Sequence, residues 1–266
     1  MISQEIIKKS AKLISGNPRV VALTGAGVSA ESGITTYRDA GGIWDRYPEG
    51  SSGGIMAVLA NHPEDAPQIL MGFINGIKTA RPNPGHMALA DLEKMGYLKS
   101  VITQNVDNLH REAGNSRVME MHGNIYRLRC IKCNNKKILE RQEFFEMMTQ
   151  LIKKMDRFSL RDIMTNFPLC SCGGNTRPDG VAFGEPVQQL KEATAEAMSC
   201  DLMLILGTSG VVYPAAAMPA HAKSQGAFLI EINPMRSALT EQCDLFIEGK
   251  TGDILPRIVS DLKGGG

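Results

Sequence analysis

Hydrophobic residues along the chain gather into short runs that alternate with amphipathic stretches. Apolar runs of strand length occur at 19–24, 98–102, 201–206, 227–232 and 244–247. Apolar residues at helical spacing separate several of these runs, at 86–95, 187–198, 215–224 and 252–262. The N-terminal positions Ile6, Ile7, Ala11, Leu13 and Ile14 predict a first helix that ends near Gly16. Alternating strands and helices predict an α/β fold, with a parallel sheet covered by helices on both faces.

Two stretches interrupt this alternation. Residues 46–54, "RYPEGSSGG", are rich in glycine and serine, which predicts a mobile loop within about 38–54. Residues 124–180 contain two close cysteine pairs with a charged, helical stretch between them. We therefore expect a small module at 124–180, inserted into a sheet domain made of 1–123 and 181–266. A helical insert at about 55–82 would belong to the sheet domain.

The charge of the chain is nearly balanced, at +1 with 29 basic and 28 acidic residues among 266. Such a chain has no global field to attract nucleic acid or a membrane surface, so we expect neither partner. No apolar stretch approaches the ~20 residues that a bilayer span needs. The N-terminus, "MISQEIIKKSAKLISGN", lacks the apolar region of a secretory signal. We expect a cytoplasmic protein whose cysteines stay reduced.

Four of the six cysteines lie in the two close pairs. The stretch "RCIKC" contains Cys130 and Cys133, and "PLCSCGG" contains Cys170 and Cys172. Four thiolates satisfy the tetrahedral coordination of zinc. Two glycines directly after Cys172 predict a turn there. Two local disulfides are the alternative, which a reducing compartment disfavours. The pairs predict one closed zinc site with a structural role, because no coordination position stays open for substrate.

The first apolar run is followed by a glycine turn, Gly25-Ala26-Gly27. This pattern is typical of a strand that leads into a pyrophosphate-binding turn for a dinucleotide. The dinucleotide could carry hydride, or it could be a substrate that is broken. A hydride-transferring unit should have a second strand that ends in an acidic residue about 20 positions later. Asp45 and Glu49 stand at that distance, but no apolar run precedes them.

The segment after the glycine turn offers other groups to a dinucleotide. Tyr37 has a ring that suits a face of the cofactor, and Arg38 has a cation that suits a phosphate. The next strand-like run begins only at Leu98. The missing acidic strand end disfavours hydride transfer and favours a dinucleotide that is consumed.

Polar residues follow several of the predicted strands, at the carboxyl ends where open α/β sheets bind ligands. They are Gln104, Asn105 and Asp107 after 98–102, His122 after 118–121, Gly207, Thr208 and Ser209 after 201–206, and Asn233 after 227–232. The imidazole of His122 titrates near neutrality and can take a proton from an alcohol. A lone histidine is more often structural, but two polar clusters at neighbouring strand ends favour catalysis.

The motifs together resemble the sirtuins, the NAD-dependent protein lysine deacylases. The stretches "GAGVSAESGI…R", "TQNVDNLH", "HG", a four-cysteine insert, "FGE", "GTS" and "IN" occur here in the order found in that family, over about 19–260. The resemblance implies a Rossmann-like large domain and a small zinc domain, with NAD and acyl-lysine entering the cleft between them. It implies NAD contacts at Gly25, Ala26, Gly27, Tyr37, Arg38, Gln104, Gly207, Thr208, Ser209 and Asn233. It also implies that Asn105 and Asp107 line the nicotinamide and ribose pocket and that His122 is the general base.

The resemblance further implies the reaction and the place of the substrate. An acylated-lysine protein or peptide would be deacylated, with nicotinamide and O-acyl-ADP-ribose as the other products. Two segments would pair with the substrate peptide as an added strand. They are Val181 with Phe183, Gly184 and Glu185, and Gly210 with Val211 and Val212.

The acyl preference follows from the helical stretch 67–82. Sirtuins that remove acidic acyl groups have a tyrosine and an arginine there, whereas this stretch has no tyrosine and its only arginine, Arg81, lies at the far end. Met71, Phe73 and Ile74 would instead form an apolar pocket, so we expect neutral acyl groups to be favoured over succinyl. The alternatives are a protein mono-ADP-ribosyltransferase, an NAD-linked oxidoreductase with structural zinc, and a non-catalytic zinc module.

Overall fold

A six-stranded sheet forms the centre of the larger domain in the computed structural model, which describes residues 3–38, 42–157, 159 and 166–264. The strand order is β3-β2-β1-β7-β8-β9, and every neighbouring pair is parallel. Because the order reverses between β1 and β7, the sheet has the doubly wound, Rossmann-like topology expected from the sequence. Its strands are β1 (Val20–Thr24), β2 (Leu98–Thr103), β3 (Val118–Glu120), β7 (Leu202–Leu206), β8 (Phe228–Asn233) and β9 (Leu245–Glu248).

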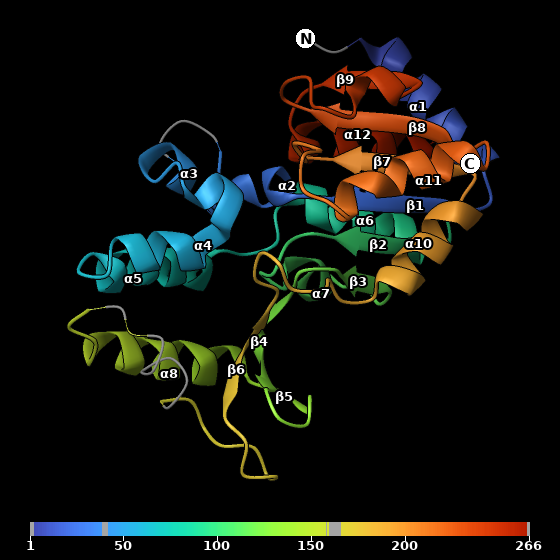
Figure 1. The fold of residues 1–266 in the computed structure, drawn as a ribbon. Helices are drawn as coiled ribbons and strands as arrows, with labels where there is room; N and C mark the ends of the chain where they lie inside the picture. Colours follow the sequence, from blue (N-terminus) through green and yellow to red (C-terminus); the bar gives the residue numbers. More distant parts are fainter. Residues whose placement is uncertain (1–2, 39–41, 158, 160–165, 265–266) are drawn as a thin grey trace.

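Helices cover both faces of this sheet (Figure 1). Successive side chains of β1 point to opposite faces, so Val20 and Ala22 join one apolar cluster while Val21 and Leu23 join another. The first cluster includes residues of α1 (Gln4–Gly16), α6 (Pro84–Lys94) and α12 (Thr251–Gly264). The second includes residues of α10 (Leu190–Ser199) and α11 (Met218–Ser224). The predicted strands and helices of the sheet domain are therefore confirmed.

Short helices complete this domain near the ends of the strands. They are α2 (Ala26–Ala30), α7 (Leu109–Glu112) and the 3-10 helices η1 (Ala215–Ala217) and η2 (Thr240–Gln242). Among the helices that the structure describes, none is both long enough and apolar enough to cross a membrane.

A second sheet lies apart from the first and is antiparallel, in the order β5-β4-β6. Its strands are β4 (Gly123–Cys130), β5 (Lys136–Ile138) and β6 (Thr176–Gly180), and α8 (Arg141–Lys153) follows β5. The strands β4 and β6 connect this module to the parallel sheet (Figure 1). A small inserted module is therefore present, and its limits at 124 and 180 stay a prediction.

Three helices follow α2, and they correct one prediction. They are α3 (Ile43–Arg46), α4 (Gly50–Asn61) and α5 (Ala66–Thr79), so the loop predicted for 46–54 is wrong where α4 begins. A Cβ at Gly50 would lie 2.0 Å from the Trp44 ring, and one at Gly54 would lie 2.6 Å from the Phe183 ring. The glycines thus permit close packing of α4, a use that composition alone does not distinguish from flexibility. Residues 39–41 of the predicted 38–54 loop lie outside the described residues.

The helix α5 shares its core with the small module. Ile74 and Ile77 pack in one cluster with Tyr126 of β4 and Phe144 of α8. Arg141, at the start of α8, donates hydrogen bonds to the carbonyls of residues 77, 78 and 80 at 2.8, 3.2 and 2.8 Å. These carbonyls lie in the last turn of α5 and at its C-cap, where the regular hydrogen bonds of a helix run out. Packing therefore associates α5 with the small module, although the sequence assigns it to the sheet domain.

Replacing Arg141 by Met should lower the free energy of unfolding by about 2–4 kcal/mol, because a hydrogen bond from a charged donor contributes ~1.5–3 kcal/mol. Urea unfolding followed by circular dichroism measures the change. Arg117 is the matched control, since its side chain is 60% exposed and pairs with Glu196. Arg117→Met should cost less than ~1 kcal/mol, and equal losses for both variants would contradict the assignment.

Candidate active site

Strand-end segments meet at the carboxyl edge of the parallel sheet, as the sequence predicts. Gln104, after β2, donates from Nε2 to the Thr208 hydroxyl at 3.0 Å. Asn233, at the end of β8, donates from Nδ2 to the Thr208 carbonyl at 2.9 Å. Thr208 and Asn233 are buried, whereas the neighbouring Ser209 is exposed. These hydrogen bonds join the ends of β2, β7 and β8 into one surface.

The glycine turn after β1 lies against the loop after β7. Gly27 donates its N–H to the Gly207 carbonyl at 2.8 Å. A Cβ at Gly27 would lie 2.8 Å from Gly207 Cα, and one at Gly25 would lie 2.8 Å from Thr208 Cβ. Residues without a side chain are therefore needed for the two loops to approach. Ala26 follows Gly25 as the first residue of α2.

Asn105 and Asp107 are held by a buried serine that the sequence did not single out. Ser29, in α2, donates from its hydroxyl to Asp107 Oδ2 at 2.7 Å and accepts from Asn105 Nδ2 at 3.0 Å. Asn105 Nδ2 also donates to the Gly25 carbonyl at 3.0 Å. Burial raises the pKa of Asp107, and the hydrogen bonds from Ser29 and from the Leu109 N–H oppose that rise. The two predicted pocket residues are thus oriented before any ligand binds.

Two buried histidines lie beneath this serine. His86 Nε2 lies 3.5 Å from the Ser29 hydroxyl, and His86 Nδ1 accepts from the Asn83 N–H at 3.4 Å. Burial lowers the pKa of His86 to about 4. His110 contacts the Thr24 hydroxyl at 2.9 Å, and burial holds the pKa of His110 well below its ordinary value. Both rings are therefore neutral near pH 7.

Tyr37 and Arg38 come directly before residues 39–41, which lie outside the described residues. The Tyr37 ring stacks on Trp44, with ring centroids 5.2 Å apart and planes inclined by 23°. Burial, together with the charge of Asp107, raises the pKa of Tyr37 to about 12. The predicted aromatic group therefore lies near the predicted nicotinamide pocket, while Arg38 is exposed.

His122 is oriented by a backbone carbonyl. Its Nδ1 lies 3.0 Å from the carbonyl oxygen of Gln104. A carbonyl can only accept, so we assign the proton to Nδ1 and the lone pair to Nε2. Burial lowers the pKa of His122, and the hydrogen bond to Gln104 partly offsets that effect. A neutral imidazole with a free Nε2 lone pair can act as a base near neutral pH.

The first predicted peptide-binding segment adjoins His122. Val181 donates its N–H to the His122 carbonyl at 2.9 Å, and the Phe183 side chain is 50% exposed. The carboxylate of Glu185 accepts hydrogen bonds from the Arg177 guanidinium at 2.5 Å. The Glu185 carboxylate is therefore paired with a residue of β6, while the backbone around the exposed Gly184 is accessible.

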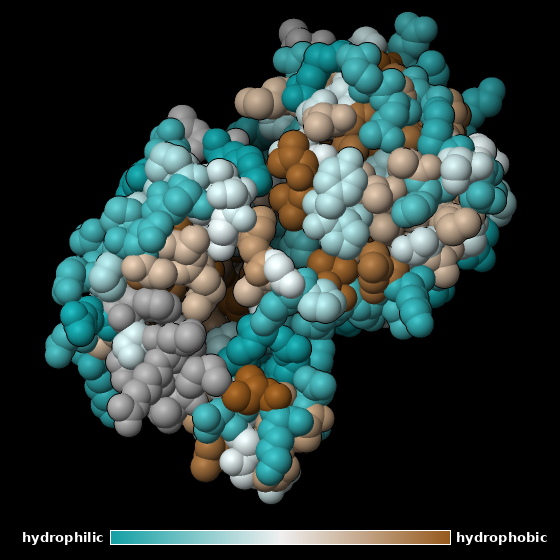
Figure 2. All heavy atoms as spheres, in the orientation of Figure 1, coloured by the Kyte–Doolittle hydropathy of each residue, from teal (hydrophilic) through white to brown (hydrophobic). Residues whose placement is uncertain are grey.

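The second predicted segment follows β7. Gly210 is buried with φ +70°, and a Cβ there would lie 2.4 Å from the Leu239 side chain. Val211 is exposed and Val212 is half-buried. Figure 2 shows a hollow between the sheet domain and the lobe that contains α4, α5 and the small module. Gly54 of α4 lies against the Phe183 ring, because a Cβ at Gly54 would be 2.6 Å from it, so the two lobes approach closely at these residues.

The four predicted zinc ligands converge in the small module. Sγ atoms lie 3.6 Å apart for Cys130 and Cys172, 3.7 Å for Cys133 and Cys170, and 3.4 Å for Cys133 and Cys172. All four lie within 4.8 Å of one another, and none forms a disulfide. Tetrahedral zinc with Zn–S bonds of about 2.3 Å needs sulfurs about 3.8 Å apart, whereas a disulfide needs about 2.05 Å. The group fits one structural zinc, and local disulfides are excluded.

Sequence reasoning missed Ser29 and His86, which fix the polar residues of the pocket. Ser29 lies one helical turn after Ala26, in a stretch read only for its glycines. His86 forms a capping box with Asn83 at the start of α6. The pattern Asn-Pro-Gly-His was a local signal for that cap, but nothing local indicated its contact with Ser29.

Metal analysis of protein purified under reducing conditions should find one tightly bound zinc per chain. Replacing Cys172 by Ser should abolish that zinc and unfold the cysteine-bearing end of the module, because that end depends on the metal. Cys200→Ser is the matched control, since Cys200 is buried outside the cluster. A folded wild-type protein without metal would refute the site.

Stability should fall as pH decreases, because buried His86 must stay neutral in the folded protein. Its pKa is about 4 when folded, against 6.5 for an ordinary histidine, so the unfolded chain binds more protons between these values. His86 thus contributes stability fully above about pH 6.5, and up to about 3 kcal/mol is lost by about pH 4. Urea unfolding between pH 4 and 7 measures the slope, which His86→Gln should flatten. An unchanged slope would contradict the neutral state of His86.

Known proteins resemble the chain over nearly its full length. The model of the Sir2 family matches residues 25–214. The NAD-dependent protein deacylase of Desulfosudis oleivorans is 48% identical over 261 residues, which cover 97% of this chain and 96% of that protein. A solved Sir2 homologue in complex with NAD has a TM-score of 0.77 and 36% identity, with 97% of this chain and 94% of that chain covered.

A further solved Sir2 protein, bound to a myristoylated histone peptide, has a TM-score of 0.69 and 34% identity, with 98% of both chains covered. The motifs predicted an enzyme of the sirtuin type, and these similarities confirm that prediction. The fold, the strand-end polar site and the sequence similarity agree, and the chain belongs to the Sir2 family.

Proposed function

We propose that the chain is an NAD-dependent protein lysine deacylase, which consumes NAD and forms deacylated lysine, nicotinamide and O-acyl-ADP-ribose. The observation that carries this proposal is the 3.0 Å contact between His122 Nδ1 and the Gln104 carbonyl oxygen. The Gln104 carbonyl holds the proton on Nδ1, so Nε2 is available as a base beside the polar edge of the sheet. Hydride transfer would also need a base, and it is disfavoured on another ground: Asp45, about 20 positions after the glycine turn, lies in α3 and not at the end of a strand.

NAD would lie along the carboxyl edge of the parallel sheet. The turn at Gly25, Ala26 and Gly27 would approach the pyrophosphate, because its backbone is not screened by side chains. Thr208, Ser209 and Asn233 would contact a ribose or phosphate at the ends of β7 and β8. Gln104, Tyr37 and Arg38 would lie toward the nicotinamide half of the molecule, beside Asn105 and Asp107.

NAD supplies a ribose carbon whose bond to cationic nicotinamide breaks as the acyl carbonyl oxygen attacks. Asn105 and Asp107 would bind at the nicotinamide and ribose, and their hydrogen bonds with Ser29 mean that they need little reorganisation. His122 would then take a proton at Nε2 from a ribose hydroxyl, whose oxygen attacks the acyl carbon. The bond from that carbon to the lysine nitrogen would break, free lysine would leave, and one water molecule would complete O-acyl-ADP-ribose. A closed pocket keeps water from intercepting the reaction.

The substrate would be an acylated lysine in an extended segment of protein. The backbones of 181–185 and 210–212 would pair with it, which implies weak sequence preference. Zinc would hold the small module together and take no part in the chemistry. The cytoplasmic location expected from the reduced thiols stays a prediction.

Neutral acyl groups fit the side chains of α5. Met71 and Phe73 are half-buried at the edge of the apolar cluster, while Ile74 is 3% exposed and belongs to its core. The guanidinium of Arg81 donates to the carbonyls of Ala80 and Lys78, at 2.7 and 3.3 Å. Arg81 thus caps the end of α5 and is not directed to an acyl carboxylate.

The proposed function is tested with NAD, an acetyl-lysine peptide and the His122→Ala variant. Wild-type protein should release nicotinamide and free lysine in equal amounts, without the absorbance of reduced cofactor. His122→Ala should still bind NAD but deacylate at least ~100-fold more slowly, the usual contribution of general-base catalysis. His221→Ala, on α11, is the matched control and should keep full activity. Unchanged turnover in His122→Ala would eliminate His122 as the base.

The acyl preference is tested on one peptide sequence carrying acetyl, butyryl, myristoyl or succinyl groups. The kcat/KM for acetyl should exceed that for succinyl by at least ~10-fold, because a succinyl carboxylate would be desolvated without a cationic partner. Met71→Arg should narrow this ratio by supplying a cation on α5. A higher kcat/KM on the succinyl peptide would overturn the preference.

A further inference from the structure

The turn that carries His122 runs from the parallel sheet into the small sheet. Residues 120–124, "EMHGN", join β3 to β4. The Met121 carbonyl accepts from the Gln188 N–H at 2.9 Å, and the His122 carbonyl accepts from the Val181 N–H at 2.9 Å. The backbone of this turn is therefore held by residues that follow β6, and its position depends on where β6 lies.

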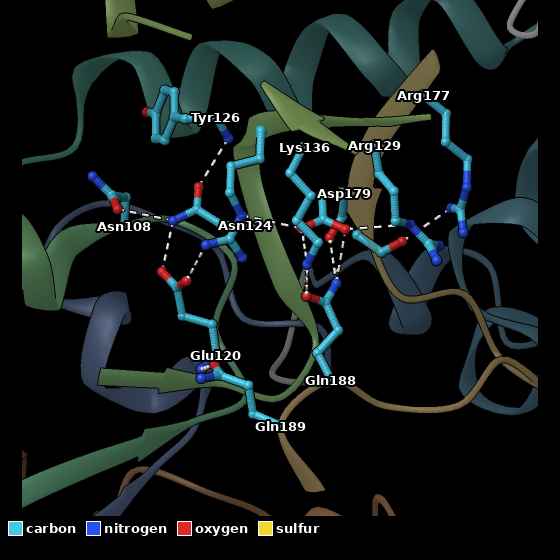
Figure 3. A network of polar contacts seen from close by, with 12 residues as sticks. Asn108, Glu120, Asn124, Tyr126, Arg129, Lys136, Arg177, Asp179, Gln188 and Gln189 are labelled. Atoms are coloured by element: carbon cyan, nitrogen blue, oxygen red, sulfur yellow. Dashed lines mark hydrogen bonds and ion pairs between the residues drawn. The ribbon is translucent and has the colours of Figure 1, made fainter. Parts of the chain in front are cut away.

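Two buried carboxylates lie on the two sides of this turn. Glu120, the last residue of β3, is 3% exposed, and Asp179, in β6, is 0% exposed. Figure 3 shows both in one polar network with Gln188 and Gln189. Glu120 belongs to the parallel sheet and Asp179 to the small sheet. A side chain that binds both carboxylates therefore links the two sheets on either side of His122.

Arg127, on β4, forms that contact. Its Nη1 donates to Glu120 Oε2 at 2.6 Å, and its Nε donates to Asp179 Oδ2 at 3.1 Å. The guanidinium is planar and always charged, and its donors diverge at fixed angles, so it can hold two carboxylates in one geometry. A lysine in its place has one ammonium group on a flexible chain.

The carbonyl of Asp179 also packs closely against the turn, at Gly123. Gly123 has φ +83°, and a Cβ there would lie 1.7 Å from the Asp179 carbonyl oxygen. Asn124 pairs with Asp179 in the ladder between β4 and β6. Gly123 directly follows His122, so a shift of Asp179 would move the residue next to the proposed base.

Each carboxylate has further partners, so we expect the fold to persist when Arg127 is replaced. Glu120 accepts from Asn124 Nδ2 at 2.7 Å and pairs with Arg111 at 3.3 Å. Asp179 pairs with Lys136 at 3.0 Å. Of the side chains named here, only Arg127 contacts both carboxylates. Replacing Arg127 would therefore remove the link between Glu120 and Asp179 but leave each with other partners.

We infer that Arg127 is a positioning residue for His122: by bridging Glu120 and Asp179 it holds the 120–124 turn so that His122 Nδ1 stays on the Gln104 carbonyl. This inference rests on the proposed role of His122 as the base. In this inference Arg127 acts only through the position of the turn.

The reaction offers two readouts that separate positioning from stability. Nicotinamide release comes before the proposed action of His122, and its reversal incorporates labelled nicotinamide into NAD in the presence of the acyl peptide. Deacylation requires the base. In Arg127→Met, deacylation should fall about 10-fold or more, since a small misplacement of a catalytic group carries a cost of that order. Nicotinamide exchange should change less than ~2-fold, because the first step needs no base.

Two further variants make the comparison specific. Arg129, two residues along β4, pairs with Asp179 at 3.3 Å and with Glu185, but not with Glu120. Arg129→Met should therefore leave the ratio of deacylation to exchange unchanged. Arg127→Lys keeps the charge but has one nitrogen in place of the separate Nε and Nη1 that reach the two carboxylates, so its ratio should fall nearly as far as that of Arg127→Met. Full rescue by lysine, or an equal loss of deacylation and exchange in both Arg127 variants, would overturn the inference.

A spectroscopic readout distinguishes failure of this inference from failure of the proposed function. In protein labelled with ¹⁵N-histidine, long-range correlation spectra show which ring nitrogen carries the proton, and the His122→Gln spectrum identifies the His122 signal among five histidines. Wild-type His122 should be protonated at Nδ1, and both Arg127 variants should exchange between tautomers. If His122 stayed protonated at Nδ1 in these variants, Arg127 would not be a positioning residue, whatever reaction the enzyme catalyses.

Discussion

The turn after β1 and the loop after β7 touch through backbone atoms, and the site takes its shape from that contact. Gly27 and Gly207 are joined by a hydrogen bond of 2.8 Å, at the point where the strand order of the sheet reverses. A side chain on either glycine would separate the two loops. Because they stay together, Gln104 reaches Thr208 and Asn105 reaches the Gly25 carbonyl. The pocket is thus organised in the free protein.

Buried polar groups beneath this surface also hold the pocket in a fixed shape. Ser29 links Asn105 to Asp107, and neutral His86 lies under Ser29. An isolated charge is costly in such an interior, so the histidines stay neutral and the polar atoms pair with one another. Fixed dipoles of this kind need no rearrangement when charge changes on a bound dinucleotide. The network is therefore suited to a site where a cationic group leaves.

The small module is assembled from segments far apart in the chain. Its core joins α5 to β4 and α8, and its cysteines come from both ends of the insert. Zinc and the apolar cluster stabilise different parts, since the cysteines lie at the far end of β4 and the aromatic side chains lie along α8. The strands β4 and β6 return to the parallel sheet on either side of His122, so packing of the module also bears on the proposed base.

The sequence by itself determined the features that depend on near neighbours. The repeats of apolar residues predicted the strands and helices of the sheet domain, and the polar residues after each strand marked its carboxyl edge. The close spacing within each cysteine pair predicted the zinc ligands. Tertiary structure decided what depends on contacts between distant segments. It turned Gly50 into a packing position of α4, joined α5 to the small module and engaged Glu185 with Arg177. It also placed His122 Nδ1 against the Gln104 carbonyl, which follows another strand, because a local pattern does not specify which distant donor or acceptor a side chain will face.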